Sequence, residues 1–395
     1  MTTTTDRLPK KLITERVENI YAPSEINMWE ENRQFSTPNA PKLRILTEFN
    51  RERLPAFVET LKKDNYLKIQ PFYQRRKRWT NKDKSLLIES FIINIPIPPV
   101  IFYEKSYSSY EVIDGQQRIN AIQEFYSNKF KLTGLDLWKD LNGYTYESLP
   151  SDIRSEIDRR SIPIIVVITE SAKREEDKFY LTQLAFERLN RGGIDMKPQE
   201  IRNCLYHGKF SELLSDLAKN TIFRKAWDLP LDETKLEKNI MYKKMEDIEL
   251  ILRFFALRHL DDFNGDIKRF LDSYMLKALN FNRDDINYLE TVFNQTIELC
   301  FSIYEENLFK PFDIKNNDWG KKSHKVYYDA IMVAFSFNLD KANIILNKKE
   351  LIIQKTKEIF YGEKSKLLSS GKTSKSETQE RIKIVNDMLI GIVKN

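Results

Sequence analysis

The sequence predicts an α+β protein, with a small mixed β-sheet surrounded by helices and then a mostly α-helical C-terminal domain. Short apolar or alternating segments with the composition of β-strands occur at 67–69, 100–104, 110–113 and 162–168. From about Leu229 onward such segments nearly vanish. Apolar residues then recur at helical spacing in 245–260, 285–306 and 325–337.

The expected elements of the first half follow in order. A helix at 54–63 precedes the first strand, and Thr80 or Asn81 caps a second helix with an apolar face. A proline cluster ends that helix and starts the strand at 100–104, which a hairpin at 106–109 joins to the strand at 110–113. Later helices are expected at 151–158, 175–190 and 198–206, the last beginning at Pro198 and capped by Gly208.

These patterns divide the chain of 395 residues into five expected parts. They are an N-terminal arm (1–40), a sheet-containing domain (41–228), a helical domain (229–362), a Lys/Ser-rich mobile linker (363–376) and a C-terminal helix (377–395).

Composition indicates a cytoplasmic protein without a membrane segment. The N-terminus lacks an apolar signal core, and the longest uncharged run, 90–103, is short and contains three prolines. Cys204 and Cys300 lie in apolar helical contexts, so we expect reduced, buried thiols. The three histidines are dispersed, and we expect no zinc, haem or flavin.

The junction at 110–126, YEVIDGQQRINAIQEFY, is the most informative segment. A strand runs into Asp114 and Gly115, and a helix follows at once. The first amides of such a helix are unpaired and point its positive end at one spot, which suits a phosphate. Gly115 would let a ligand approach the backbone, and Arg118 would bind phosphate through two donors.

A structural alternative stands beside this interpretation. Asp114 and Gln117 have the spacing of an acidic capping box, which would explain both side chains without a ligand. It leaves Gly115, Gln116 and Arg118 unexplained. Because a charge at a helix start is seldom part of a core, we expect Arg118→Ala to leave the fold intact.

Two further segments are candidate binding elements. Six basic residues and one acidic residue lie between Tyr73 and Lys84, which suits a nucleic-acid backbone, although a solvated face is the alternative. The turn Asn190, Arg191, Gly192, Gly193 can present amides to a phosphate, or Gly192 can simply cap a helix. The candidate nucleic-acid contacts are Gln74, Arg75, Arg76, Lys77, Arg78 and Trp79.

Five segments together resemble one known family. In chain order they are PFYQRRKRW (71–79), LIESFIINIPIPPVIFYE (87–104), VIDGQQR (112–118), FERLNRGGIDMKPQEIRN (186–203) and MEDIELILRFFALR (245–258). Over roughly 45–260 the chain resembles the GmrSD-type restriction endonuclease N-terminal domain family, of the ParB/sulfiredoxin-like superfamily. No HNH nuclease module is recognisable, which argues against cleavage by this chain.

The resemblance implies a triphosphate-dependent role in DNA restriction or anti-phage defence, with modified DNA as a target to be sensed. The nucleotide would contact Gly115, Gln116, Gln117, Arg118, Asn190, Arg191, Gly192 and Gly193, with Asp114 and Arg118 in catalytic roles and Mg²⁺ bound with the triphosphate. Glu200, Arg202 and Asn203 also match family positions and would brace the nearby turn.

Alternatives are a non-catalytic module that binds DNA or docks a partner, and a stand-alone Mg²⁺-dependent nuclease. The expected partners are DNA, and a separate nuclease or a second copy bound through the helical domain.

Overall fold

The computed structural model describes residues 46–63, 67–68, 79–106, 109–168, 198–206, 208–260, 266–362, 365–369 and 374–394. The chain divides between Leu205 and Tyr206 into two compact units, a sheet unit and a helical unit. This division precedes the expected boundary at residue 228. The reason is packing, because Phe210 contacts Phe255 and Tyr274 of the helical unit, at ring-centroid distances of 5.6 and 5.4 Å.

The sheet unit contains a mixed sheet, as predicted, with one strand more than the four expected, in the order β1-β5-β3-β4-β2. The pairs β1–β5 and β3–β4 are antiparallel, whereas β3–β5 and β2–β4 are parallel. The strands are β1 (Leu46–Arg53), β2 (Leu67–Lys68), β3 (Val100–Ser106), β4 (Ser109–Asp114) and β5 (Ser161–Ile168).

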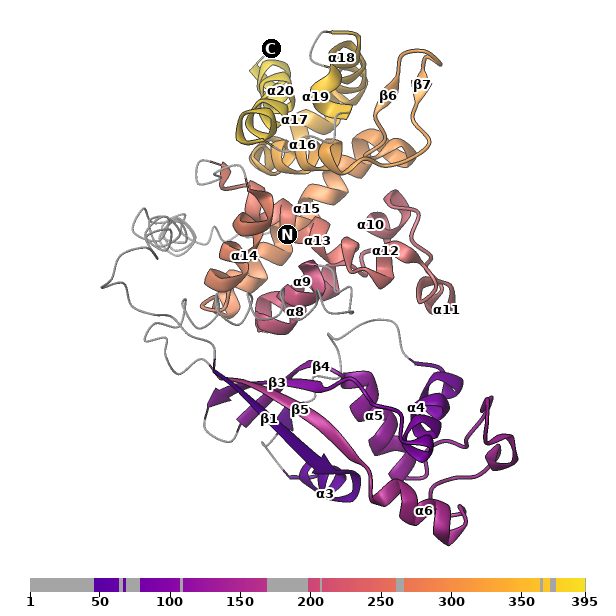
Figure 1. Cartoon of the computed structure of the whole chain (residues 1–395). Helices are drawn as coiled ribbons and strands as arrows, with labels where there is room; N and C mark the ends of the chain where they lie inside the picture. Colours follow the sequence, from indigo (N-terminus) through magenta and orange to yellow (C-terminus); the bar gives the residue numbers. More distant parts are fainter. Residues whose placement is uncertain are drawn as a thin grey trace, which may run out of the picture. The chain divides into compact units, whose positions relative to one another are not determined.

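Helices cover one face of this sheet and form the core with it (Figure 1). Side chains of alternate residues on β3 and β5, such as Val100, Phe102, Ile162 and Ile164, belong to the same apolar cluster as the helices. The helices of the unit are α3 (Leu54–Thr60), α4 (Asn81–Ile93), α5 (Gln116–Tyr126), the 3-10 turn η4 (Lys139–Leu141), α6 (Ser151–Asp158) and α8 (Pro198–Leu205).

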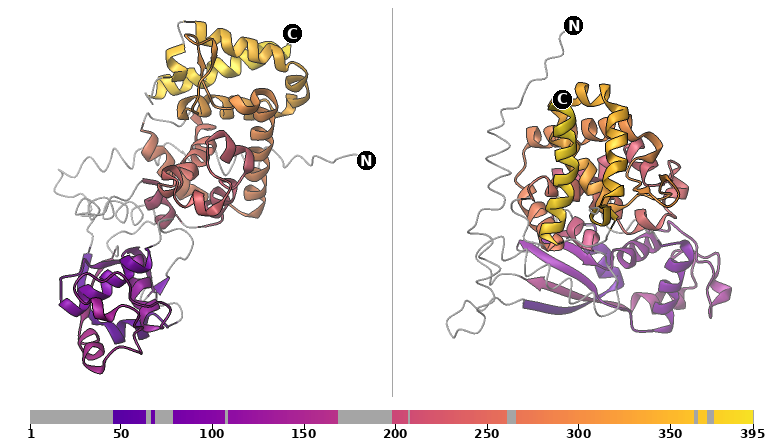
Figure 2. Two further views of the ribbon diagram at one scale, coloured as in Figure 1. Left: turned by 90° about the vertical axis from the view of Figure 1, so that its right-hand side faces the viewer. Right: turned by 90° about the horizontal axis from the view of Figure 1, so that it is seen from above.

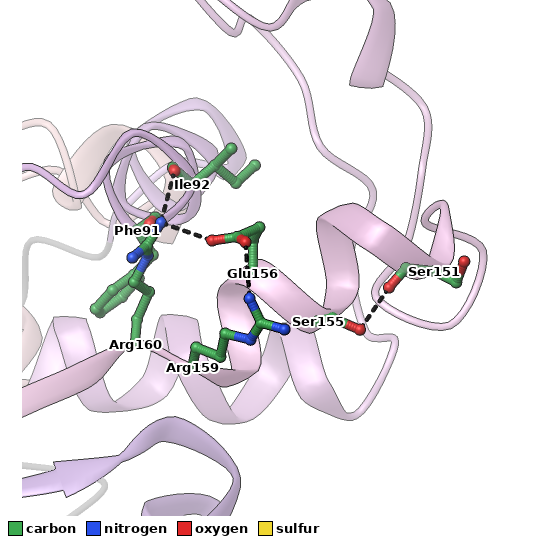
Figure 3. A network of polar contacts seen from close by, with 7 residues as sticks. All are labelled: Phe91, Ile92, Ser151, Ser155, Glu156, Arg159 and Arg160. Atoms are coloured by element: carbon green, nitrogen blue, oxygen red, sulfur yellow. Dashed lines mark hydrogen bonds and ion pairs between the residues drawn. The ribbon is translucent and has the colours of Figure 1, made fainter.

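Helix α4 is closed at both ends by side chains. Thr80 caps its first turn and exchanges hydrogen bonds with Asp83, which confirms the predicted start. At the other end, Arg160 donates to the carbonyls of Phe91 (3.0 Å) and Ile92 (3.5 Å), and it pairs with Glu156 at 3.0 Å (Figure 3). Arg160 therefore adds side-chain donors at the last carbonyls of the helix, where the Phe91 carbonyl also accepts from the N–H of Asn94.

Three features differ from expectation. Strand β1 was not predicted, since its residues 47–51 are all exposed and show no alternation; its Phe49 is 75 % exposed. Gly208 does not cap α8 but precedes α9. A short helix, α19 (Ser365–Ser369), lies within the predicted linker, because Leu368 is buried.

The helical unit is built around one fully enclosed helix, α16, in which every residue from Val326 to Ser336 is buried. It packs against α13, α15 and α20, while α18 and α20 lie side by side (Figure 2). A buried two-point ion pair joins Arg253 of α13 to Asp329 of α16.

The helices of this unit are α9 (Lys209–Leu217), α10 (Thr221–Ala226), α11 (Glu233–Leu236), α12 (Ile240–Lys243), α13 (Glu246–Leu257), α14 (Ile267–Ala278), α15 (Arg283–Tyr304), α16 (Lys325–Ser336), α17 (Ala342–Asn347), α18 (Lys349–Tyr361), α19 and α20 (Lys375–Lys394). Two 3-10 turns, η6 (Glu305–Asn307) and η7 (Leu339–Lys341), and a small hairpin of β6 (Phe312–Asp313) and β7 (Asp318–Trp319) complete it.

Among the described residues, no helix combines the length and the apolar character needed to cross a bilayer.

Candidate functional site at the start of helix α5

The predicted strand-to-helix junction is present. Strand β4 ends at Asp114, Gly115 adopts a left-handed conformation (φ 91°, ψ 9°), and α5 begins at Gln116. Within the described residues no side chain caps the first turn of α5. The capping box expected between Asp114 and Gln117 is therefore wrong, because each of these side chains bonds elsewhere. A helix start without a side-chain cap among the described residues is a place where an anion can bind.

Gly115 is required by the protein's own packing as well as by its backbone angle. A Cβ atom added at Gly115 would lie 2.5 Å from Cγ1 of Val100 and 3.1 Å from Nη2 of Arg118. The start of β3 thus fills the space beside this glycine. The absence of a side chain at Gly115 lets α5 pack closely against the start of β3. Close approach of a ligand is therefore not needed to explain this glycine.

Arg118 is directed inward onto the β4–α5 junction. Its Nη2 donates to Asp114 Oδ2 at 2.7 Å and to the carbonyl of Pro99 at 3.1 Å. The side chains of Arg118 and Asp114 are only 12 % and 10 % exposed. Removal of Arg118 would leave a largely buried carboxylate and a carbonyl without this donor, so these contacts argue against the expectation that Arg118→Ala leaves the fold intact.

The guanidinium of Arg118 keeps unused donor capacity. Its Nε is buried and has no hydrogen-bond partner among the described residues. A buried N–H without an acceptor is unfavourable, and an anionic oxygen at that place would satisfy it. Among the described residues, the site therefore combines a helix start without a side-chain cap, a carboxylate and a partly satisfied guanidinium within one turn of α5.

Gln117 connects this turn to the end of the basic segment. Its Oε1 accepts a hydrogen bond from the backbone N–H of Trp79 at 3.2 Å. The Trp79 ring is partly buried and packs against the apolar core of the sheet unit. Residue 79 thus lies beside α5, whereas Gln74, Arg75, Arg76, Lys77 and Arg78 lie outside the described residues and stay predictions.

Lys84 is committed within the sheet unit and does not add to a basic surface. Its Nζ lies 2.6 Å from Glu124 of α5 and 5.6 Å from the centre of the Phe130 ring. In the described part of the basic segment 73–84, fewer positive charges are therefore available to a partner than the sequence alone indicates.

The second predicted element is only partly described. Asn190, Arg191, Gly192 and Gly193 lie outside the described residues, and nothing is seen of the Glu200 side chain. In α8, Arg202 and Asn203 are buried at 2 % and 1 % exposure, and both bond to Gln199, at 3.2 and 2.9 Å. Sequence reasoning missed Gln199, although it falls inside the matching segment 186–203.

Glu89 is another polar residue that sequence reasoning missed. It is 4 % exposed, and its carboxylate accepts hydrogen bonds from the amides of Asp136 (3.1 Å), Leu137 (2.8 Å) and Trp138 (2.8 Å). Burial alone would raise the pKa of Glu89, but the three amides outweigh it and the pKa lies below its ordinary value. The available signal was a carboxylate inside the apolar run 86–93.

No preformed metal site is present in the described ranges, where no group of three or more His, Cys, Asp or Glu side chains converges. His259 is partly buried in the helical unit, and desolvation and then Arg258 lower its pKa to about 3, so it is neutral at pH 7. Cys300 is a buried free thiol, as expected, and burial raises its pKa.

Comparison with known proteins matches one family model to this region. The model described as GmrSD restriction endonuclease, N-terminal domain, covers residues 58–207. This range includes the β4–α5 junction and α8, and it lies within the 45–260 region of expected resemblance. The comparisons with curated proteins and with solved structures gave no match.

Proposed function

We propose, from the premise that residues 58–207 belong to the GmrSD restriction endonuclease N-terminal domain family, that this chain binds and hydrolyses a nucleoside triphosphate at the start of α5. Membership in that family implies a component of a restriction system. Within such a system the triphosphate would drive or license an action on DNA, modified DNA included.

The observation that carries the proposal is that, within the described part of the chain, the first turn of α5 has no side-chain cap and lies beside a guanidinium whose Nε has no acceptor. Backbone amides at a helix start and an arginine fork are the two groups that bind phosphate most effectively in proteins. Both come from three consecutive positions, Gln116 to Arg118, and Gly115 sets their direction. The resemblance of the DGQQR element to the family's nucleotide-binding element supports the same assignment.

Arg118 would act by sharing its donors between Asp114 and a phosphate oxygen. The Asp114–Arg118 pair holds the guanidinium in place before the nucleotide arrives, which reduces the entropy lost on binding. The carboxylate of Asp114 could then orient a water molecule. Phosphoryl transfer needs little covalent chemistry from a protein, so positioning and charge neutralisation are the contributions expected of these residues.

The residues present fit Mg²⁺ only in part. Asp114 is the one carboxylate of the turn, and one of its oxygens already accepts from Arg118. Mg²⁺ commonly keeps several waters and binds through one or two carboxylates plus substrate phosphates. The ion would therefore arrive with the triphosphate, with Asp114 as a candidate ligand, and it would supply charge neutralisation.

A paired substitution tests the proposal without leaving a buried charge. Asp114→Asn/Arg118→Gln removes both charges of the site together. Lys84→Gln/Glu124→Gln removes another ion pair that includes a residue of α5 and serves as the matched control. Binding of a non-hydrolysable triphosphate would be measured by calorimetry with Mg²⁺, and hydrolysis by phosphate release with and without duplex DNA.

We expect the site variant to lose at least about tenfold in triphosphate affinity, since a charge-assisted hydrogen bond contributes about 1.5–3 kcal/mol. The control should bind as the wild type does. Equal binding by both variants would contradict the proposal. Binding of DNA without any response to nucleotide would instead favour a non-catalytic DNA-binding module.

A further inference from the structure

The β6–β7 hairpin of the helical unit lies outside the family match and carries an exposed set of lysines. Phe312 pairs with Trp319 and Asp313 with Asp318, and Gly320 N–H donates to the Pro311 carbonyl at 2.8 Å. The residues of the tip, 314–317, are all exposed. The hairpin runs beside α18 (Figure 1).

The hairpin is anchored to the unit by aromatic packing. Trp319 packs edge-on against Tyr304 of α15 and against Phe312, at centroid distances of 5.9 and 5.6 Å. The Tyr361 hydroxyl of α18 donates to Asn317 Oδ1 at 2.9 Å. The tip is therefore held in one position, which lowers the entropy lost when it binds a partner.

Positive side chains outnumber negative ones on the hairpin and its flanks. Lys310, Lys315, Lys321 and Lys322 form no ion pair with any described carboxylate, and the last three are exposed. The two acidic residues, Asp313 and Asp318, accept hydrogen bonds from groups of the hairpin.

Asp313 accepts from the N–H of Lys315 (3.0 Å) and from the amide of Asn316 (2.6 Å). Asp318 accepts from the N–H of Trp319 at 2.7 Å. The four lysines outnumber these two carboxylates, so the hairpin and its flanks keep a net positive charge.

We propose that this hairpin is a contact for duplex DNA, an inference that rests on the proposed role in restriction and adds a DNA-binding element outside the matched domain. A two-stranded ribbon fits the major groove, which is about 12 Å wide. Lysines at its base and tip would meet phosphates on the groove edges, while Asn316 and Ile314 lie where the groove floor would be.

The experiment uses the full chain and a fluorescent duplex of random sequence, with anisotropy measured between about 50 and 200 mM salt. The hairpin variant is Lys315→Gln/Lys321→Gln/Lys322→Gln. Its matched control, Lys341→Gln/Lys383→Gln/Lys394→Gln, removes the same charge from exposed positions elsewhere in the helical unit. Circular dichroism verifies that both variants fold.

The slope of log affinity against log salt should fall by about 0.9 for each phosphate contact removed, or about 2 to 3 for the hairpin variant, with at least about tenfold weaker binding at low salt. The control should keep the wild-type slope. Equal behaviour of the two variants, or a preference of the wild type for single strands or RNA, would overturn the proposal. Triphosphate affinity is measured on the same samples. A loss of DNA binding with unchanged triphosphate affinity would then concern the hairpin alone, and the proposed triphosphate site is tested separately.

Discussion

Replacement of Gly115 by alanine should destabilise the β4–α5 junction, and the structure gives two separate causes. The φ of +91° costs a residue with a side chain about 1–2 kcal/mol. The new Cβ would also lie 2.5 Å from Val100 Cγ1 and 3.0 Å from its Cβ, and overpacking of this kind costs about 1–3 kcal/mol. We therefore expect a total loss of about 2–5 kcal/mol.

A double substitution separates the two causes. Val100 is fully buried, so Val100→Ala alone should cost about 1.5–3 kcal/mol through lost burial and a small cavity. In Gly115→Ala/Val100→Ala the clash is relieved but the strained φ remains. The double variant should thus be more stable than the sum of the single effects predicts, by about 1–3 kcal/mol.

Hydrogen exchange read by mass spectrometry suits this test, because the chain has two units and a single unfolding transition is not assured. Peptides from residues 110–126 should exchange faster in Gly115→Ala, and the double variant should recover part of the protection. Peptides from α16 in the helical unit provide the internal control. Strictly additive effects of the two substitutions would refute the claim that Val100 is what excludes a side chain at position 115.

Two further predictions concern buried carboxylates. Because the folded pKa of Glu89 lies below its unfolded value of about 4.3, its stabilisation should be complete above that pH and lost as the pH falls through the folded pKa. Acid should therefore increase exchange at 136–138 in the wild type, whereas Glu89→Gln should already show faster exchange at neutral pH and no such step; an acid step that persists in Glu89→Gln would exclude this carboxylate as its source. In the helical unit, Arg253→Met should cost about 3–5 kcal/mol by leaving Asp329 buried without its partner, and Arg253→Met/Asp329→Leu should cost less. Urea unfolding would measure the stability of the helical unit in the two variants. A double variant less stable than Arg253→Met would contradict the reasoning.

The candidate site was predictable in outline because its local geometry depends on near neighbours. An alternating strand, Asp114, Gly115 and a helix with apolar spacing of three and four are sufficient to indicate the junction, and the structure confirms it. The expected cap at Thr80 or Asn81 likewise indicated the start of α4, and the structure shows that Thr80 is the cap. The partners of the side chains were not predictable, since Asp114 selects Arg118 rather than the helix amides and Gln117 selects the amide of Trp79.

The sequence by itself determined the α+β class, most helix and strand positions and the family resemblance of residues 58–207, because caps, periodicity and short motifs are properties of neighbouring residues. Tertiary structure decided the rest. Strand β1 forms by pairing with β5, although its residues 47–51 are exposed. Residues 365–369 form a helix within a polar segment because neighbouring elements bury the side chain of Leu368. Contacts between residues distant in sequence also decide that Arg118 is held inward and that Val100 occupies the space beside Gly115, and no local pattern records such contacts.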